Sequence, residues 1–324
     1  MVYFATNKTK PMSKPKIVYL DAATVDDLAV FDKFSDLGDF TTHALTEPDE
    51  VVERAADAQV VITNKVKLTA EIIDQLPKLE LICVAATGTN NIDKEAAKAR
   101  DIPVKNVAGY STDSVAQLTL TAYFTVAMDL LHLNREVYNG NYSKAKDFTL
   151  WRHPFYELKG KRFGIIGLGT IGTRVAELAV AYGAEVVYHS ISGRDHDVPY
   201  ARLDLDELLS SSDVVSIHSA LSDKTRHLLQ EEELKKMKPT AYLINVARGG
   251  IVEEAALARA IDAETIAGAA VDVFTTEPIP DDHPYLKVKR QERLLLTPHV
   301  GWASVEARTR LIESIIDNIR EFYS

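Results

Sequence analysis

Residues 161–194 read KRFGIIGLGTIGTRVAELAVAYGAEVVYHSISGR and decide the fold. The apolar run 163–166 predicts a buried parallel strand, and the glycine-rich segment 167–172 follows it directly. Apolar residues then recur at helical spacing over 171–182, a glycine ends the helix, and 185–189 predicts a second strand. Strand, glycine turn, helix and strand in this order are typical of a dinucleotide-binding domain.

The glycines of Gly167-Leu168-Gly169-Thr170-Ile171-Gly172 have separate roles. Gly167 permits the tight turn, Gly169 lets a pyrophosphate approach the backbone, and Gly172 lets the helix pack closely on its strand. The pyrophosphate would bind free N–H groups at the helix N-terminus, where the helix dipole favours negative charge. We therefore predict cofactor contacts at Gly167, Gly169, Thr170, Ile171 and Gly172. The alternative, a purely structural turn, is disfavoured because the motif follows a strand and opens a helix.

The end of the second strand differs from the usual NAD pattern. An acid about 20 residues after the glycines normally binds the ribose 2′-OH of NAD. Here His189 and Ser190 occupy that place and Arg194 follows. Ser190 and Arg194 could bind a 2′-phosphate, which no carboxylate there would repel. We predict NAD(P) as cofactor, with a weak preference for NADP. The alternative is that Arg194 is a solvated loop charge and NAD binds without the acid.

Composition bounds the class of protein. A chain of 324 residues suits two domains, and its formal net charge of −10 argues against nucleic acid as a partner. Cys83 is the only cysteine, so an internal disulfide is excluded and the chain fits a reducing compartment. It lies in an apolar run. No apolar stretch approaches the roughly 20 residues of a membrane span, and residues 1–16 lack the pattern of a secretory signal. We expect a cytoplasmic protein that binds neither nucleic acid nor membrane, with no metal site.

Strands and helices alternate along the chain, which predicts an α/β protein with parallel sheets covered by helices on both faces. The first part is flavodoxin-like in outline, and six strands complete a Rossmann dinucleotide-binding domain around the glycine motif. Besides 163–166 and 185–189, the predicted strands are 16–20, 60–63, 79–86, 104–107, 213–218, 241–246, 266–273 and 294–297. The predicted helices include 25–34, 69–76, 92–100, 203–209, 231–237 and 253–261.

The domain order follows from these elements. Residues 1–110 and 300–324 are assigned to a substrate (catalytic) domain, because the helix 304–322 has no place in the second sheet and would cross back. Residues 111–299 form the NAD(P)-binding Rossmann domain. Within it 111–137 predicts one long helix, apolar on most sides, that links domains or packs against another subunit. We therefore expect a homodimer, with 139–153 as a loop or arm.

Polar residues follow three predicted strands of the second domain, in 245–250 (NVARGG), 272–278 (DVFTTEP) and 297–301 (TPHVG). Open parallel sheets bind ligands at the carboxyl ends of their strands, so these segments should border one cleft. Arg248 can grip a carboxylate through two hydrogen bonds, and His299 supplies an acid or base. Glu277 bonded to the far imidazole nitrogen would orient the ring and favour its charged form. With a nicotinamide, this set suits hydride transfer to a 2-keto acid.

Each of these residues has a plainer interpretation. Arg248 could be a surface charge, although the neighbouring Gly249-Gly250 pair suggests that a ligand approaches the backbone. Glu277 is one of 47 acidic residues, so its case depends on the other two. Most histidines must be structural or solvated. Those in stretches without another functional signal are His43, His132, His196, His227 and His283.

From Lys16 to the C-terminus the chain resembles the D-isomer-specific 2-hydroxyacid dehydrogenases, because the four motifs quoted above occur in the family's order. The resemblance implies that Arg248 binds the substrate carboxylate, that Glu277 orients the histidine, and that His299 is the general acid and base. It also places Thr87 and Gly88, in Ala86-Thr87-Gly88-Thr89-Asn90-Asn91, as a loop whose amides hold the carboxylate from the other domain. Asp272 matches the residue that binds the nicotinamide carboxamide. The remaining implied cofactor contacts are His218, Thr225 and Ala247.

Three stretches resemble the glycerate dehydrogenase, or hydroxypyruvate reductase, branch of the family: GTNNID at 88–93, GYSTDSVAQ at 109–117 and LWRHPFYEL at 150–158. We expect reduction of hydroxypyruvate or glyoxylate to the D-2-hydroxy acid. The alternatives are another activity of the family, such as a D-lactate, phosphoglycerate or broad 2-keto acid reductase, and an NAD(H)-sensing protein like the C-terminal-binding corepressors. Trp151 either reaches a neighbouring subunit's active site or packs locally.

Overall fold

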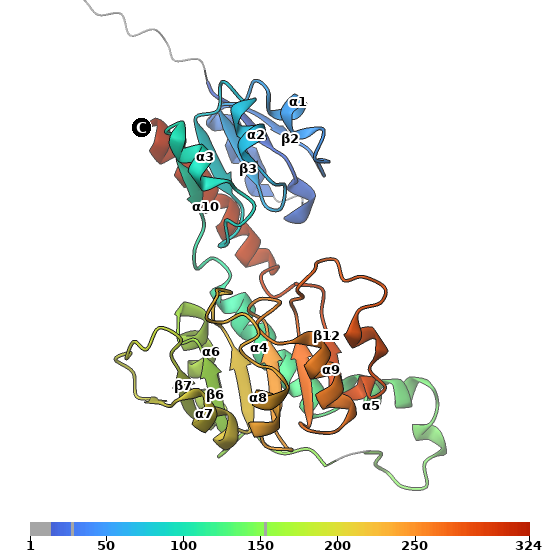
Figure 1. Cartoon of the computed structure of the whole chain (residues 1–324). Helices are drawn as coiled ribbons and strands as arrows, with labels where there is room; N and C mark the ends of the chain where they lie inside the picture. The colour runs from blue at the N-terminus through green and yellow to red at the C-terminus, as the bar shows by residue number, and fades with distance from the viewer. Residues whose placement is uncertain (1–13, 27–28, 152–153) are drawn as a thin grey trace, which may run out of the picture. The chain divides into compact units, whose positions relative to one another are not determined.

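A computed structural model describes residues 14–26, 29–151 and 154–324. The chain divides into two compact units (Figure 1). Unit 1 contains Met1–Tyr110 and Val305–Ser324, and unit 2 contains Ser111–Ser304. Residues 1–13, and Arg152 and His153 of the predicted arm, lie outside the described residues.

Unit 1 is built on a five-stranded parallel sheet in the order β2-β1-β3-β4-β5. This order is flavodoxin-like, as predicted. The edge strand β2 was missed, because its sequence DFTT is largely exposed and carries no apolar run. The strands are β1 (Lys16–Tyr19), β2 (Asp39–Thr42), β3 (Val60–Thr63), β4 (Leu81–Val84) and β5 (Val104–Asn106).

Three short helices pack with one face of this sheet: α1 (Val51–Ala55), α2 (Ala70–Asp74) and α3 (Lys94–Ala99). The C-terminal helix α10 (Val305–Tyr323) packs against β4 and against the 3-10 helix η2 (Ala29–Asp36). The predicted α-helix over 25–34 is wrong: η1 (Ala22–Thr24) precedes η2, and Asp26 between them has φ 65°. A left-handed residue cannot continue a right-handed helix.

Unit 2 contains a seven-stranded parallel sheet in the order β12-β11-β10-β9-β6-β7-β8. The six predicted strands are present, and the seventh, β8, has only two residues, too few for a sequence pattern. The strand order reverses at β6, where an open α/β sheet forms its ligand crevice. The strands are β6 (Arg162–Ile166), β7 (Glu185–His189), β8 (Ala201–Arg202), β9 (Val214–Ile217), β10 (Tyr242–Asn245), β11 (Gly268–Val271) and β12 (Leu294–Leu296).

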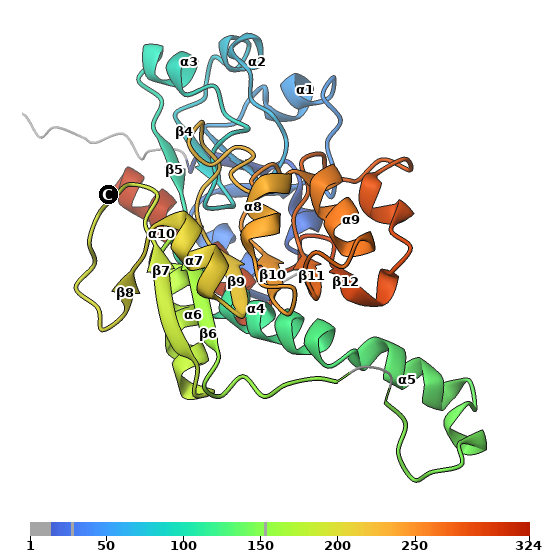
Figure 2. The ribbon, with the colours of Figure 1, turned by 60° about the horizontal axis from the view of Figure 1, so that its bottom comes forward.

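Helices cover both faces of this sheet (Figure 2). Side chains of β6 alternate between them: Phe163 and Ile165 join the core under α4 and α6, whereas Ile166 joins the core under α7, α8 and α9. This two-sided burial explains why the strands read as unbroken apolar runs. The helices are α4 (Thr112–Ala127), α6 (Thr170–Ala181), α7 (Leu205–Ser211), α8 (Glu231–Lys236) and α9 (Glu254–Asp262).

The single long helix expected over 111–137 is broken. α4 ends at Ala127, and α5 (Leu130–Tyr138) continues at an angle of 59°. Asp129 between them has φ 53°, a left-handed conformation that interrupts the helix. α4 contributes eight buried residues to unit 2, whereas α5 contributes none and extends away from the sheet (Figure 2). Among the described residues no single helix has the length and apolar composition of a membrane span, and only the bent α4–α5 pair does when taken together.

Candidate active site

The sequence-predicted residues of unit 2 follow six strands of one parallel sheet, so they lie along its carboxyl edge. Thr87 and Gly88 follow β4 and belong to unit 1. The predicted set in unit 2 comprises Gly167, Gly169, Thr170, Ile171, Gly172, Ser190, Arg194, His218, Thr225, Ala247, Arg248, Asp272, Glu277 and His299.

The glycine turn has the geometry that a pyrophosphate requires. Gly167 has φ 94°, and a Cβ there would lie 2.8 Å from the backbone nitrogen of Ser219. A Cβ on Gly172 would lie 2.3 Å from the carbonyl oxygen of Gly167, so this turn of α6 packs against the glycine loop. A Cβ on Gly169, the N-cap of α6, would have no atom within 4 Å. Open space therefore lies over the N-terminus of α6, as a dinucleotide needs.

The loop after β7 carries the residues that would meet the adenosine ribose. Ser190 is buried with its Oγ 3.4 Å from Oγ of Ser192, and the exposed Arg194 has no carboxylate partner among the residues that the structure describes. The acid nearest in sequence, Asp195, pairs with Nε of Arg202 at 3.0 Å. This ion pair offsets the negative charge of Asp195, which leaves the loop compatible with an additional phosphate.

His218 and Thr225 occupy the loop after β9. The Nε2 of His218 lies 2.8 Å from Oγ of Ser216, and burial lowers the pKa of His218 to about 3. This ring is therefore neutral at physiological pH. The Thr225 hydroxyl donates to the carbonyl of Ala220 at 2.7 Å and accepts the N–H of Ser222 at 2.7 Å. Thr225 thus shapes this loop through its hydroxyl.

The arginine loop after β10 is organised by Asn245, which is 2% exposed. Its amide donates to the carbonyl of Arg248 at 3.1 Å, and its side-chain oxygen accepts the N–H of Ala247 at 3.2 Å. The Arg248 guanidinium is exposed and contacts the Ala247 carbonyl at 2.7 Å. No acidic side chain pairs with Arg248 in the described part of the chain, so its charge is available to an anionic ligand.

Asp272, at the end of β11, holds the histidine loop. Its buried carboxylate accepts the Thr297 hydroxyl at 2.6 Å and the N–H groups of Val300 and Gly301 at 2.9 Å each. The Asp272 carbonyl accepts the N–H of His299 at 2.8 Å. These bonds fix His299 at φ 53°, a conformation that non-glycine residues adopt rarely.

Glu277 and His299 form the pair that the sequence predicted. Nδ1 of His299 lies 2.7 Å from Oε2 of Glu277, and Oε1 of Glu277 accepts the N–H of Phe274 at 3.0 Å. Because a carboxylate only accepts, Nδ1 carries a proton, which leaves Nε2 as the nitrogen for a ligand. Both side chains are partly exposed, at 25% for His299 and 31% for Glu277.

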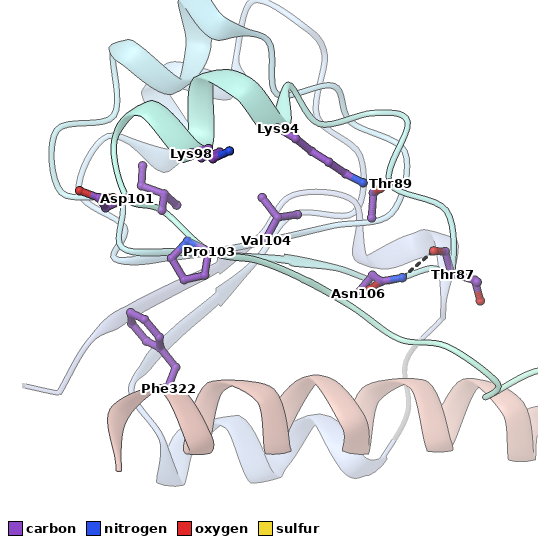
Figure 3. A pocket seen from close by; sticks show the side chains of 10 residues that line it. Thr87, Thr89, Lys94, Lys98, Asp101, Pro103, Val104, Asn106 and Phe322 are labelled. Carbon is purple, nitrogen blue, oxygen red and sulfur yellow. Dashed lines mark hydrogen bonds between the residues drawn. The ribbon is translucent and has the colours of Figure 1, made fainter.

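In unit 1 the loop after β4 borders a polar hollow of 810 Å³ (Figure 3). The Asn106 amide donates to the Thr87 carbonyl at 2.6 Å, and the Thr87 hydroxyl donates to the Val107 carbonyl at 3.1 Å. The neighbouring loop after β3 is held by Asp21, whose buried carboxylate accepts the N–H groups of Asn64, Lys65 and Val66 at 2.6–3.1 Å. The segment that contains Thr87 and Gly88 is thereby anchored within unit 1.

His283 lies in a stretch of sequence without a functional signal. The structure buries its side chain against Glu254, next to the segment that carries Glu277. No spacing signal joins these residues, because they lie 29 positions apart and meet only through tertiary packing.

The family description "D-isomer specific 2-hydroxyacid dehydrogenase, NAD binding domain" matches residues 120–301. The chain belongs to this dehydrogenase family. A glycerate dehydrogenase of Methylorubrum extorquens is 38% identical, over 95% of this chain and 96% of that protein. A hydroxypyruvate reductase of Blautia hydrogenotrophica is 35% identical, over 86% of each. The solved NADPH-dependent glyoxylate/hydroxypyruvate reductase of Sinorhizobium meliloti, in complex with NADP and malonate, superposes with a TM-score of 0.83 at 26% identity, over 96% of this chain and 94% of that one.

This membership confirms the predicted family and makes the chain an NAD(P)-dependent D-2-hydroxyacid dehydrogenase, an oxidoreductase acting on a CH–OH group. For the dehydrogenase, the carboxyl edge of the unit 2 sheet is the candidate site of hydride transfer.

Proposed function

We propose that this dehydrogenase reduces hydroxypyruvate or glyoxylate to the corresponding D-2-hydroxy acid. The observation that carries the proposal is the pair of His299 and Glu277 at 2.7 Å, at the same sheet edge as Arg248 and the glycine turn. The substrate choice is supported by relatives named glycerate dehydrogenase and hydroxypyruvate reductase at 38% and 35% identity.

A reduced nicotinamide, when bound, would supply the hydride for the keto carbon. Arg248 holds the substrate carboxylate through two parallel hydrogen bonds. Nε2–H of protonated His299 donates its proton to the carbonyl oxygen as the negative charge develops there. Glu277, bonded to Nδ1, stabilises the imidazolium before that transfer. One hydride and one proton thus convert C=O to CH–OH, and the neutral ring regains its proton from solvent.

We further propose that NADPH is the preferred hydride donor and that Asp272, besides holding the histidine loop, faces the nicotinamide carboxamide. The preference is supported by Ser190 and Arg194 after β7 and by the absence of a carboxylate at the end of that strand. Arg194 has no acidic partner within the described residues and suits a phosphate ligand. The S. meliloti reductase, which is named as NADPH-dependent, supports the same choice.

A homodimer through α5, residues 139–151 and residues 154–156, together called the exposed arm, is also proposed. The large apolar side chains of this arm are exposed although soluble proteins seldom leave so many together, and a second copy of the chain would cover them. Tyr138 and Phe148 reach 84% and 87% exposure. The other exposed members are Leu130, Leu131, Val137, Tyr142, Leu150, Trp151, Phe155 and Tyr156.

The cytoplasm is the proposed location. Cys83 is fully buried as a free thiol, and burial raises its pKa to about 12, so it behaves as a core residue. A protein whose one cysteine is a core thiol needs no oxidising compartment for its stability.

Initial rates on hydroxypyruvate, glyoxylate and pyruvate, each with NADH and NADPH, test these proposals. The highest kcat/KM on hydroxypyruvate or glyoxylate with NADPH is the expected result. High rates with NADH alone would support the proposed substrate and reject the proposed preference for NADPH. A preference for pyruvate would move the chain to another activity of the family. Tight cofactor binding with negligible turnover on every 2-keto acid would favour a binding protein like the corepressors.

A further inference from the structure

A second histidine–carboxylate pair lies behind the loop that carries Glu277. The side chain of His283 is 4% exposed, and its Nε2 lies 3.1 Å from Oε2 of Glu254. Nδ1 of His283 accepts the N–H of Tyr285 at 3.3 Å, so Nε2 carries the proton and donates it to Glu254. The rings of Phe274 and Tyr285 pack on the imidazole. The orientation and tautomer of His283 are therefore set by its surroundings.

The other oxygen of Glu254 holds the backbone of the glutamate loop. Oε1 of Glu254 accepts the N–H of Thr275 at 2.8 Å. The preceding N–H, that of Phe274, donates to Oε1 of Glu277 at 3.0 Å. Two consecutive amides are thus held by two carboxylates, one from the start of α9 and one from the pair with His299. A continuous set of hydrogen bonds runs from His283 through Glu254 and this backbone to Glu277.

The same backbone also meets the arginine loop. A Cβ on Gly249 would lie 1.9 Å from the carbonyl carbon of Phe274 and 2.3 Å from the nitrogen of Thr275. Only glycine fits at that distance, so the loop that carries Arg248 packs directly on the Phe274–Thr275 peptide. The position of this peptide therefore affects both the loop of Arg248 and the side chain of Glu277.

We propose that Glu254 and His283 are positioning residues of the hydride-transfer reaction. They hold the Phe274–Thr275 peptide, and through it they set Glu277 against His299. The inference rests on the proposed roles of Glu277 and His299. Loss of the Glu254 carboxylate would leave the N–H of Thr275 without its acceptor, so the peptide could rotate and change the geometry of the Glu277 side chain.

The test is Glu254→Gln, because the amide keeps the size of the side chain but has one acceptor oxygen for two donors. Glu253→Gln is the matched control: it lies at the start of the same helix, and its carboxylate faces Arg259 at 4.0 Å. We expect Glu254→Gln to lower kcat about tenfold, as a small misplacement of a reacting group does, with the cofactor Kd unchanged. The control should retain normal kcat.

A double-mutant cycle separates positioning from general loss of structure. In a Glu277→Gln background, Glu254→Gln should change kcat less than about twofold, because its target is already removed. An equal loss in both backgrounds would overturn the inference, as would a normal kcat for Glu254→Gln. Full turnover of Glu277→Gln or His299→Ala would instead refute the proposed catalytic roles of Glu277 and His299, so the two failures are distinguishable.

Two variants of His283 test the same inference if Glu254→Gln does not fold. His283→Gln retains an N–H donor for Glu254, whereas His283→Leu removes it at similar size. We expect His283→Gln to keep most of the turnover and His283→Leu to lose it to the same extent as the Glu254 variant. Equal turnover of the two histidine variants would overturn the role of the hydrogen bond.

Discussion

Oε2 of Glu277 lies 2.7 Å from Nδ1 of His299, while the backbone of His299 is held at φ 53° by Asp272. The imidazole is thus fixed from two directions, by a carboxylate on its ring and by hydrogen bonds to its loop. A rare backbone conformation persists only where neighbouring contacts determine it. Because Nδ1 is bonded to Glu277, Nε2 is the ring nitrogen that can donate a proton to the substrate.

Replacement of Glu277 by glutamine removes the charge that favours the imidazolium. The reduction needs the protonated ring, so kcat should fall by about 10² or more. The measurement is kcat for reduction by the wild type and the variant under the same conditions. An equal kcat in the two proteins would remove Glu277 from the mechanism.

Arg248→Lys keeps the positive charge and removes the planar pair of donors. A lysine ammonium cannot form two parallel hydrogen bonds with a carboxylate, so KM for the keto acid should rise about tenfold or more. The cofactor Kd is the internal control and should stay constant. Steady-state kinetics with unchanged KM and kcat would show that Arg248 does not hold the carboxylate.

Arg194→Ala tests the site of the 2′-phosphate. Loss of a charge-assisted hydrogen bond of about 1.5–3 kcal/mol should raise KM for NADPH by about tenfold or more. KM for NADH should change little, which makes NADH the control within the same variant. If both constants move together, or neither moves, Arg194 does not select the cofactor.

The neutral, half-buried His218 predicts a pH dependence of the free energy of unfolding. Its folded pKa of about 3 lies below the ordinary value of 6.5, so the unfolded chain binds one more proton between these two values. Stability is complete above pH 6.5 and falls as the pH falls through this window. Between pH 7 and 5 the wild type should lose up to about 2 kcal/mol more than His218→Asn. Urea unfolding at both pH values measures this, and equal losses would contradict it.

If the exposed arm forms the dimer interface, one negative charge introduced there should prevent dimerisation. Leu131 on α5 is 55% exposed, and Leu131→Glu should shift the protein to monomers, because burying an unpaired carboxylate in an apolar interface is costly. Leu45→Glu, at a position that is 66% exposed in unit 1, is the control and should leave the oligomeric state unchanged. Light scattering after size exclusion gives the mass. A wild-type monomer would reject the dimer itself.

Strands and helices with a clear apolar pattern are predictable from the sequence, whereas elements that form only through tertiary contacts are not. β6 and β7 were found as apolar runs beside glycines, whereas β2 is a largely exposed edge that forms only by pairing with β1. The helix predicted over 111–137 failed at Asp129, whose left-handed backbone leaves no apolar signature. Apolar periodicity reports burial, and it says little about single backbone conformations.

The sequence by itself determined the family and the α/β class, and it indicated Arg248, Glu277 and His299 as candidate site residues, because glycine turns and polar residues after apolar strands are local patterns. Only the tertiary structure decided that Asp272 holds the histidine loop and that Glu254 and His283 lie behind Glu277. The hydrogen bonds of these residues join segments 21–29 positions apart. Such pairings arise when strands and helices pack, and no spacing along the chain encodes them.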